Sequence, residues 1–238
     1  MRAAIALGVA LLAAPAFGVT CENNWFDGRS YTICSVDPVR ETLRLFLRDA
    51  AGNPFGDFAA VEAAQGSLAF AMNAGMYHPD RAPVGLYIED GVQVMRLLTE
   101  GSPGNFGMLP NGVFCIGVGQ ARVIETLAFA AEVPGCRDAT QSGPMLVIDG
   151  ALHPRFLPDS PSRNIRNGVG TTAAGDRVIF AISDEAVTFH EFARLFRDGL
   201  GLPNALYFDG RISRLHAPGL GRSDWGAAMG PIVGVLAD

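Results

Sequence analysis

The sequence predicts a single α+β domain, rich in β-structure, with a mixed sheet and a few helices. One observation behind this is a strand–helix–strand pattern over residues 178–210. A second is a series of Asp-Gly and Asn-Gly dipeptides between β-like runs, such as Asp90-Gly91 between residues 84–89 and 92–97, which predicts hairpins. A third is the alternation of leucine with other residues over 43–48, typical of a half-buried strand.

The C-terminal unit begins with the apolar run 178–182 and ends with a second run, 205–208. Between them, Thr188 and Glu191 have the spacing of a capping box, which predicts the start of a helix. Apolar residues then recur at helical spacing until Gly199, where the helix is expected to end. A crossover of this kind makes its two strands parallel, so their carboxyl ends are expected at the same edge of the sheet.

An acidic residue follows each of these strands, Asp184 after the first and Asp209 after the second. Ligands bind at the carboxyl ends of strands in open sheets, and paired carboxylates serve the hydrolysis of sugar bonds. Each residue also has another interpretation. Asp209-Gly210 fits a tight turn, and Asp184 with Glu185 fits the acidic start of the helix.

A further helix and strand are predicted earlier in the chain. Residues 54–65 fit a short helix ended by Gly66, and residues 67–72 fit the strand after it. Asn73 then stands at the end of a strand, in the same kind of position as the two aspartates.

The start of the chain has the pattern of a secretory signal peptide: Met1-Arg2, an apolar run over 3–14 and small residues up to Gly18. The apolar run is shorter than a typical membrane-spanning helix. The alternative is that the segment is not cleaved and remains as a membrane anchor. We therefore expect residues 1–18 to be removed. Residues 19–238 are expected to form one exported domain, periplasmic or extracellular, without a stable membrane anchor.

Four cysteines suit an oxidising compartment. They allow three pairings, and spacing alone does not choose among them. We expect Cys21–Cys34 and Cys115–Cys136, because each pair closes a modest local loop. No Cys-x-x-Cys spacing or neighbouring histidine indicates zinc.

The charged residues restrict the class of ligand. All 18 basic residues are arginines, and the net charge is -6. An acidic chain without a basic stripe is not expected to bind nucleic acid. Any anionic group of a substrate must be held by arginine, backbone amides or polar side chains, because the chain contains no lysine.

Several short motifs occur in order over residues 67–236. They are Asn73-Ala-Gly-Met-Tyr77, Asn111-Gly-Val-Phe114, Gln141-Ser-Gly-Pro144, Arg163-Asn-Ile-Arg166-Asn-Gly-Val-Gly170, Asn204-Ala-Leu-Tyr-Phe-Asp-Gly210 with Ser213, and Gly230-Pro231. Together they resemble the phosphodiester glycosidase family, whose best-known member is the lysosomal uncovering enzyme, N-acetylglucosamine-1-phosphodiester alpha-N-acetylglucosaminidase. The chain departs from that enzyme at Asp209-Gly-Arg-Ile-Ser213, where the enzyme has a run in the style Asp-Gly-Gly-Gly-Ser. The first motif of the chain, Asn73-Ala-Gly-Met-Tyr77, also differs from that of the enzyme, which is closer to Asn-Gly-Gly-Phe-Phe. The chain therefore looks closer to the short secreted bacterial branch of the family.

The resemblance strengthens Asp209 as a nucleophile or base acting on an oxocarbenium-like transition state. Arg163 and Arg166, followed by an expected Asn167-Gly168 turn, suit a phosphodiester oxygen, and Arg166 matches the family motif better. The alternative is a pair of surface arginines on a loop. The other candidate substrate-binding residues, each of which also fits a turn or bulge, are Asn73, Gly75, Asn111, Gln141, Ser142, Gly143, Gly210 and Ser213.

The leading prediction is a hydrolase that cleaves the glycosidic bond of a sugar-1-phosphodiester in an exported glycoconjugate. Its predicted catalytic residues are Asp209, Arg166 and Asp184. No cofactor is expected, although a divalent cation among Asp184, Glu185 and Asp209 is compatible with the sequence. The alternative is a non-catalytic periplasmic module that binds a glycan or phosphosugar.

Overall fold

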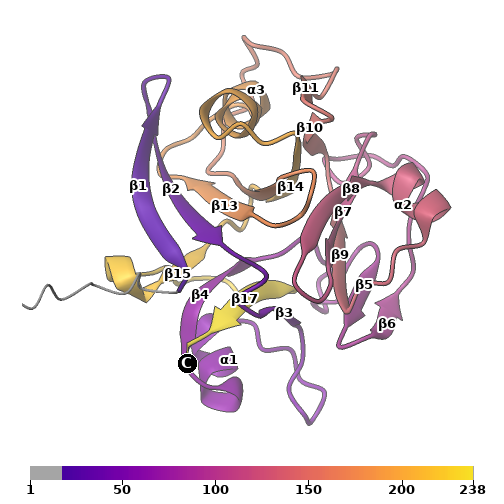
Figure 1. The fold of residues 1–238 in the computed structure, drawn as a ribbon, viewed down its shortest axis with the longest axis vertical. Helices are drawn as coiled ribbons and strands as arrows, with labels where there is room; N and C mark the ends of the chain where they lie inside the picture. The colour runs from indigo at the N-terminus through magenta and orange to yellow at the C-terminus, as the bar shows by residue number, and fades with distance from the viewer. Residues whose placement is uncertain (1–17, 238) are drawn as a thin grey trace, which may run out of the picture.

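The computed structural model describes residues 18–237, so the predicted signal peptide lies, apart from Gly18, outside the described residues. The strands of this region form three sheets (Figure 1). The seven-stranded sheet has the order β1 (Thr20–Phe26), β2 (Arg29–Val36), β13 (Val178–Ser183), β12 (Asn167–Thr171), β14 (Asn204–Asp209), β10 (Met145–Ile148) and β11 (Ala151–Leu152).

The other two sheets have five strands each. One has the order β16 (Arg222–Ser223), β15 (Leu215–Ala217), β4 (Leu68–Asn73), β17 (Ile232–Leu236) and β3 (Leu43–Phe46). The other has the order β6 (Val92–Met95), β5 (Tyr87–Glu89), β9 (Asp138–Ser142), β7 (Gly112–Ile116) and β8 (Ala121–Glu125).

Short helices flank these sheets in Figure 1. They are α1 (Phe58–Gln65), α2 (Thr126–Glu132) and α3 (Phe189–Arg194), which runs on into a π-helical turn, Leu195–Gly199, while a 3-10 turn spans Pro218–Leu220. The α+β class is confirmed. The helix expected over 54–65 begins only at Phe58, because the Asp57 side chain accepts the Ala60 N–H at 2.7 Å and caps the helix there.

The seven-stranded sheet is antiparallel, not mixed as predicted, and every strand pair in residues 18–237 is antiparallel. The reason is β12, which lies between β13 and β14 and runs antiparallel to both. Asn167-Gly168 is therefore the start of a central strand and not a turn. Because β13 and β14 run in the same direction, their carboxyl ends do lie at one edge, with Asn167 between them.

The capping box that starts α3 is confirmed. The Glu191 N–H donates to Thr188 Oγ1 at 3.1 Å, and the Thr188 N–H donates to the Glu191 carboxylate at 2.8 Å. Phe192 and Phe196 then pack with Tyr31 of β2 on one face of the seven-stranded sheet. The capping box thus fixes the direction in which the chain crosses from β13 to β14.

The main core lies where the three sheets meet. Phe70 of β4 packs against Phe180 of β13 with ring centroids 4.7 Å apart, and Phe114 of β7 contacts both Phe180 and Phe208. All four rings are fully buried. Burial of side chains of this size is the main source of stability for the fold, and it holds the end of β14 in place.

Both predicted disulfides are confirmed, Cys21–Cys34 and Cys115–Cys136. The first joins directly opposite residues of β1 and β2. In the part of the chain that the structure describes, no helix has the length and apolar character needed to cross a bilayer.

Candidate active site

Asp209, the last residue of β14, lines a cleft of about 790 Å³. Its side chain is 9 % exposed, so the carboxylate is buried but can be reached from the cleft. The walls come from four segments of the chain and consist of Met76, Tyr77, Arg81, Val84, Gly104, Asn105, Arg211, Ile212, Ala227 and Ala228. A cleft of this size accommodates a small-molecule ligand.

Main-chain amides hold the Asp209 carboxylate. The N–H groups of Gly210 and Arg211 donate to its Oδ1 at 2.6 and 2.8 Å, and that of Ile212 does so at 3.5 Å. Asp209 thus forms the turn that Asp-Gly predicts, and it also lines the cleft. Burial raises the pKa of the Asp209 carboxyl, and the amides of Arg211, Gly210 and Ile212 offset part of that rise. Within the described residues, all hydrogen bonds to this carboxylate reach Oδ1, which leaves Oδ2 for a ligand.

A pair of buried asparagines fixes the main chain around Asp209. The side-chain amide of Asn167 donates to the main-chain oxygen and to Oδ1 of Asn73, both at 3.0 Å. Its Oδ1 accepts the N–H of Asp209 at 3.2 Å, while the N–H of Arg214 donates to Asn73 Oδ1 at 2.8 Å. Since Asn73 ends β4 and Asn167 starts β12, the pair joins two sheets at the site. Ser213 completes it through a hydrogen bond from its hydroxyl to Asn167 Oδ1 at 3.3 Å.

Two cationic side chains, Arg81 and Arg211, line the cleft together with Asp209. The Arg81 guanidinium lies 5.3 Å from the centroid of the Tyr77 ring, and its backbone has a φ of 71°. A left-handed backbone is unfavourable for a residue other than glycine, and such strain concentrates at functional sites. Burial raises the pKa of the Tyr77 hydroxyl, which donates to the main-chain oxygen of Ala228 at 2.9 Å. The cleft therefore has a surplus of positive charge in a protein whose net charge is -6.

Arg166 does not line the cleft. It is fully buried, and its Nε donates to the main-chain oxygen of Val187 at 2.9 Å. The guanidinium lies 3.6 Å from the centroid of the Phe189 ring and 3.4 Å from the Tyr207 hydroxyl. Burial lowers the pKa of Arg166, and no carboxylate in residues 18–237 forms an ion pair with it.

Tyr207 connects this buried arginine to the cleft. Its hydroxyl interacts with Asn105 of the cleft wall as well as with Arg166. It also lies where a side chain at position 210 would be, so a residue with a Cβ atom would clash with the hydroxyl there. Gly210 is therefore required by the close approach of Tyr207, while its N–H binds Asp209.

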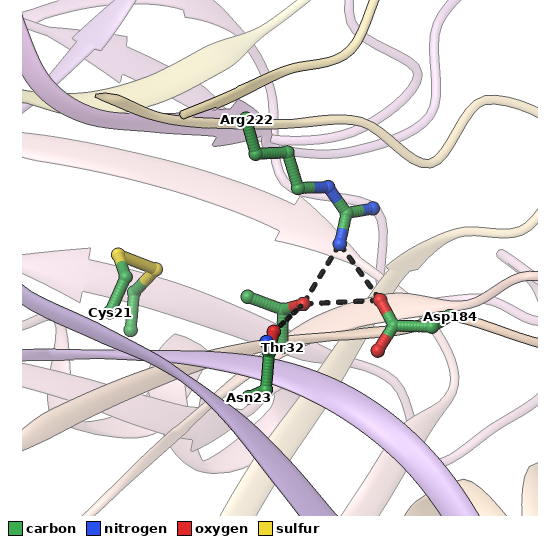
Figure 2. Close-up of a disulfide and its surroundings, with 6 residues drawn as sticks. Cys21, Asn23, Thr32, Asp184 and Arg222 are labelled. Atoms are coloured by element: carbon green, nitrogen blue, oxygen red, sulfur yellow. Dashed lines mark hydrogen bonds and ion pairs between the residues drawn. A yellow bond between two sulfur atoms is a disulfide. The ribbon is translucent and has the colours of Figure 1, made fainter. Parts of the chain in front are cut away.

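Asp184 lies at the expected edge of the sheet and is not among the residues that line the cleft. Figure 2 shows it beside Arg222 and Thr32. Its carboxylate accepts hydrogen bonds from Arg222 at 2.8 Å, from Ser30 at 2.8 Å and from Thr32 at 3.1 Å. The structure thus places Asp184 and Asp209 on either side of β12 and gives Asp184 its own cationic partner.

Arg163 and Glu185 are also engaged outside the cleft. Arg163 binds Glu191 through two hydrogen bonds of 2.8 and 3.0 Å, and Glu185 pairs with Arg29 at 2.8 Å. Both pairs connect elements around the start of α3. In residues 18–237, no group of three or more His, Cys, Asp or Glu side chains is arranged to hold a metal ion.

Three polar residues of the motifs support the cleft wall from behind. The amide of Asn111 donates to the main-chain oxygen of Phe106 at 2.9 Å, in the loop that carries Asn105. Gln141 accepts the N–H groups of two neighbouring loops, and Ser142 donates to the main-chain oxygen of Phe208 at 3.0 Å. All three side chains are buried, and none lines the cleft.

The two motif glycines allow close packing. Gly75 has a φ of 146°, and a Cβ there would lie 3.1 Å from Thr140 Oγ1. A Cβ at Gly143 would lie 2.6 Å from the Cβ of Asn111. These contacts explain why glycine occupies both positions.

A sequence model of the phosphodiester glycosidase family matches residues 66–215, more than half of the chain and including Asp209 and the asparagine pair. The chain belongs to the phosphodiester glycosidase family. It is 34% identical over 216 residues to the uncharacterized protein YigE of Escherichia coli (strain K12), which covers 89% of this chain and 84% of YigE.

Solved structures share the fold. The catalytic domain of zebrafish N-acetylglucosamine-1-phosphodiester alpha-N-acetylglucosaminidase, auto-inhibited by its pro-peptide, has a TM-score of 0.62 at 12% identity, covering 93% of this chain and 83% of that one. A putative exported protein from Burkholderia pseudomallei K96243 has a TM-score of 0.57 at 13% identity, covering 88% of this chain and 74% of that one. At these identities the likeness concerns the fold alone.

In this family member, sequence reasoning missed the residues that give the cleft its charge. Arg211 lies between Asp209 and Ser213, where it interrupts the glycine-rich run of the family motif, and a lone departure of this kind does not indicate a cleft position. Arg81 and Asn105 lie in loops with no periodic pattern, so no local signal marks them. Tyr77, the last residue of the first motif, was available in the sequence as a candidate.

Proposed function

We propose that the protein is a hydrolase that cleaves the glycosidic bond of a sugar-1-phosphodiester, with Asp209 as its catalytic carboxylate. The observation that carries the proposal is the cleft itself, in which one buried carboxylate faces a space bordered by two arginines. Membership of the phosphodiester glycosidase family supports the reaction class.

Asp209 suits attack on an anomeric carbon. Its Oδ1 is held by main-chain amides, which fixes the orientation of the carboxylate of this cleft-lining residue. Burial raises its pKa, and a more basic carboxylate is a better base for water and a better nucleophile once it is ionised. In either role it stabilises the positive charge that develops on the sugar ring in the transition state.

Arg81 and Arg211 suit the departing phosphate. Guanidinium groups match the oxygens of a phosphate, and neutralising the negative charge favours cleavage of the bond to the sugar. A phosphate is already a good leaving group, so a strong general acid is less necessary than in ordinary glycosidases. Asp209 is indeed the only carboxylate among the described residues that line the cleft.

Arg166 has a positioning role in this proposal. Its buried guanidinium holds the Tyr207 hydroxyl, which in turn contacts Asn105 and packs over Gly210. Asp184 takes no part in the reaction as we propose it, because Arg222 neutralises it away from the cleft. We place the protein in the periplasm or outside the cell, which its two disulfides support.

The test is sugar release by the purified protein with its disulfides intact. The substrates are N-acetylglucosamine-1-phosphodiesters, other sugar-1-phosphodiesters and nucleotide sugars. We expect Asp209→Asn to lower turnover roughly a thousandfold while substrate still binds. Arg211→Ala is expected to lower kcat/KM about a hundredfold through the lost phosphate contact, and Arg155→Ala, an exposed arginine outside the cleft, serves as the matched control.

If no substrate releases sugar, and Asp209→Asn changes neither turnover nor affinity, the proposed reaction is wrong. Binding of a phosphosugar without turnover would instead identify a binding module.

A further inference from the structure

Trp225 is an exposed residue of the segment that leads into the wall of the cleft. Its side chain is 93 % exposed, more than that of any other large hydrophobic residue in the described part of the chain. Two and three residues further on, Ala227 and Ala228 line the Asp209 cleft. A single exposed apolar side chain is ordinary on a protein surface, but an exposed tryptophan on a segment that forms the wall of a cleft calls for an explanation.

The segment that carries Trp225 is fixed at its start. The N–H of Asp224 donates to the main-chain oxygen of Leu215 at 2.9 Å, and the N–H of Leu215 returns a bond to the Asp224 carboxylate at 3.0 Å. Arg222 binds Asp224 at 3.0 Å and reaches Asp184 at 2.8 Å (Figure 2). The residue before Trp225 is therefore tied to two strands.

The segment is also fixed at its end. The Tyr77 hydroxyl donates to the main-chain oxygen of Ala228 at 2.9 Å. The N–H of Met229 donates to the main-chain oxygen of Gly56 at 2.7 Å. Between the two anchors, Gly226 adopts a φ of 144° that only glycine accepts readily. Because the backbone is held on both sides of Trp225, little backbone freedom remains to be lost when a ligand binds to the indole.

The residues next to Trp225 in the chain favour a sugar ring as the ligand. Its neighbours in the sequence are small or polar, Ser223, Asp224, Gly226 and Ala227. A protein partner would be expected to meet a wider apolar surface around the tryptophan, and a membrane surface a basic apolar cluster. A pyranose ring needs neither, since one face of carbon-bound hydrogens covers the indole while its hydroxyls stay in water.

We propose that Trp225 is a sugar-stacking platform at the mouth of the Asp209 cleft, which binds a ring of the glycan on the far side of the phosphodiester from the sugar that is released. In this arrangement a ring of the glycan next to the scissile bond covers the indole, while the terminal sugar phosphate enters the cleft. This inference rests on the proposed function, because only a glycan that continues beyond the bond to be cleaved reaches both places.

The test uses the two tryptophans of the chain, Trp25 and Trp225. Trp25 is 72 % exposed on β1, four strands away from β14 in the sheet, or about 19 Å at the usual strand spacing. Trp25→Phe leaves Trp225 as the only tryptophan, and Trp225→Phe leaves Trp25. Each variant is titrated with chitotriose, maltotriose and cellotriose while its tryptophan fluorescence is recorded, and a thermal melt checks its fold.

We expect a saturable change in fluorescence with at least one trisaccharide in Trp25→Phe and none in Trp225→Phe. By calorimetry, Trp225→Ala should weaken binding of that trisaccharide about tenfold, as the loss of a covered ring face implies, and Trp25→Ala should not. No response to any of the three sugars at Trp225, or an equal response at Trp25, overturns the inference. The titration needs no bond cleavage, so binding at Trp225 without sugar release counts against the proposed function alone.

Discussion

Replacing Asn167 with alanine tests whether the asparagine pair holds the site together. Asn167 is fully buried, and its amide contacts Asn73, the N–H of Asp209 and the Ser213 hydroxyl. Asn73 and Ser213 keep other partners for their oxygens, Arg214 N–H and the main chain respectively. Two buried donors, however, lose the acceptor that the structure gives them: the Asp209 N–H and the Asn73 side-chain amide.

The size of the effect follows from those two donors. A buried donor left without an acceptor costs roughly 1–3 kcal/mol, so the variant should lose about 4 kcal/mol of unfolding free energy. That is a large part of the 5–15 kcal/mol, roughly, that stabilises a typical domain. The measurement is urea-induced unfolding followed by far-UV circular dichroism, compared with Asn23→Ala.

Asn23 is a matched control because it is exposed and makes one long contact, 3.5 Å to Thr32. Its variant should change the unfolding free energy by less than about 0.5 kcal/mol. If Asn167→Ala costs no more than the control, the two sheets are not joined through this pair and the reasoning fails.

Two further predictions concern Asp209 and the first disulfide. Burial raises the pKa of Asp209 in the folded state above its value in the unfolded chain, near 3.8. Protonated Asp209 therefore contributes to the unfolding free energy below the unfolded pKa, and this contribution is lost as the pH rises through the folded pKa. Asp209→Asn should therefore melt at a higher temperature than the wild type at pH 7, with the difference vanishing towards pH 3; a difference that is the same at every pH would refute this. Replacing both Cys21 and Cys34 with alanine should lower the unfolding free energy by about 3 kcal/mol, since the bond closes a loop with a sequence separation of 13. An unchanged urea midpoint under oxidising conditions would contradict it.

Local patterns in the sequence were sufficient where the structure is determined locally. The capping box of Thr188 and Glu191, and the Asp90-Gly91 hairpin, whose two residues have φ values of 49° and 77°, depend on neighbours in the chain. The insertion of β12 was not predictable in this way. Gly168 and Gly170 do not resemble a buried strand, and they are glycines because a Cβ would lie 2.5 Å from the Leu206 oxygen and 2.7 Å from Leu202.

The same division applies to the site. Asp209 could be found because it ends a clear strand, and Asn73 because it ends another. Arg166 has the type of side chain that binds phosphate, but the sequence does not show that it lies behind the cleft under Phe189. The cleft arginine Arg81 comes from a loop about 130 residues away from Asp209, and only the folded chain brings the two together.

The way in which Asp209 is held has a consequence for how this family diversifies. The carboxylate is bound by the N–H groups of residues 210–212, and any residue except proline supplies such a group. Arg211 and Ile212, which stand in place of glycines in the uncovering enzyme's Asp-Gly-Gly-Gly-Ser run, thus leave the hydrogen bonds to the carboxylate intact while they line the cleft. Mutations at these two positions can therefore change which molecules fit the cleft without disturbing the Asp209 carboxylate. Ligand preference can change in this way while the proposed catalytic group is kept.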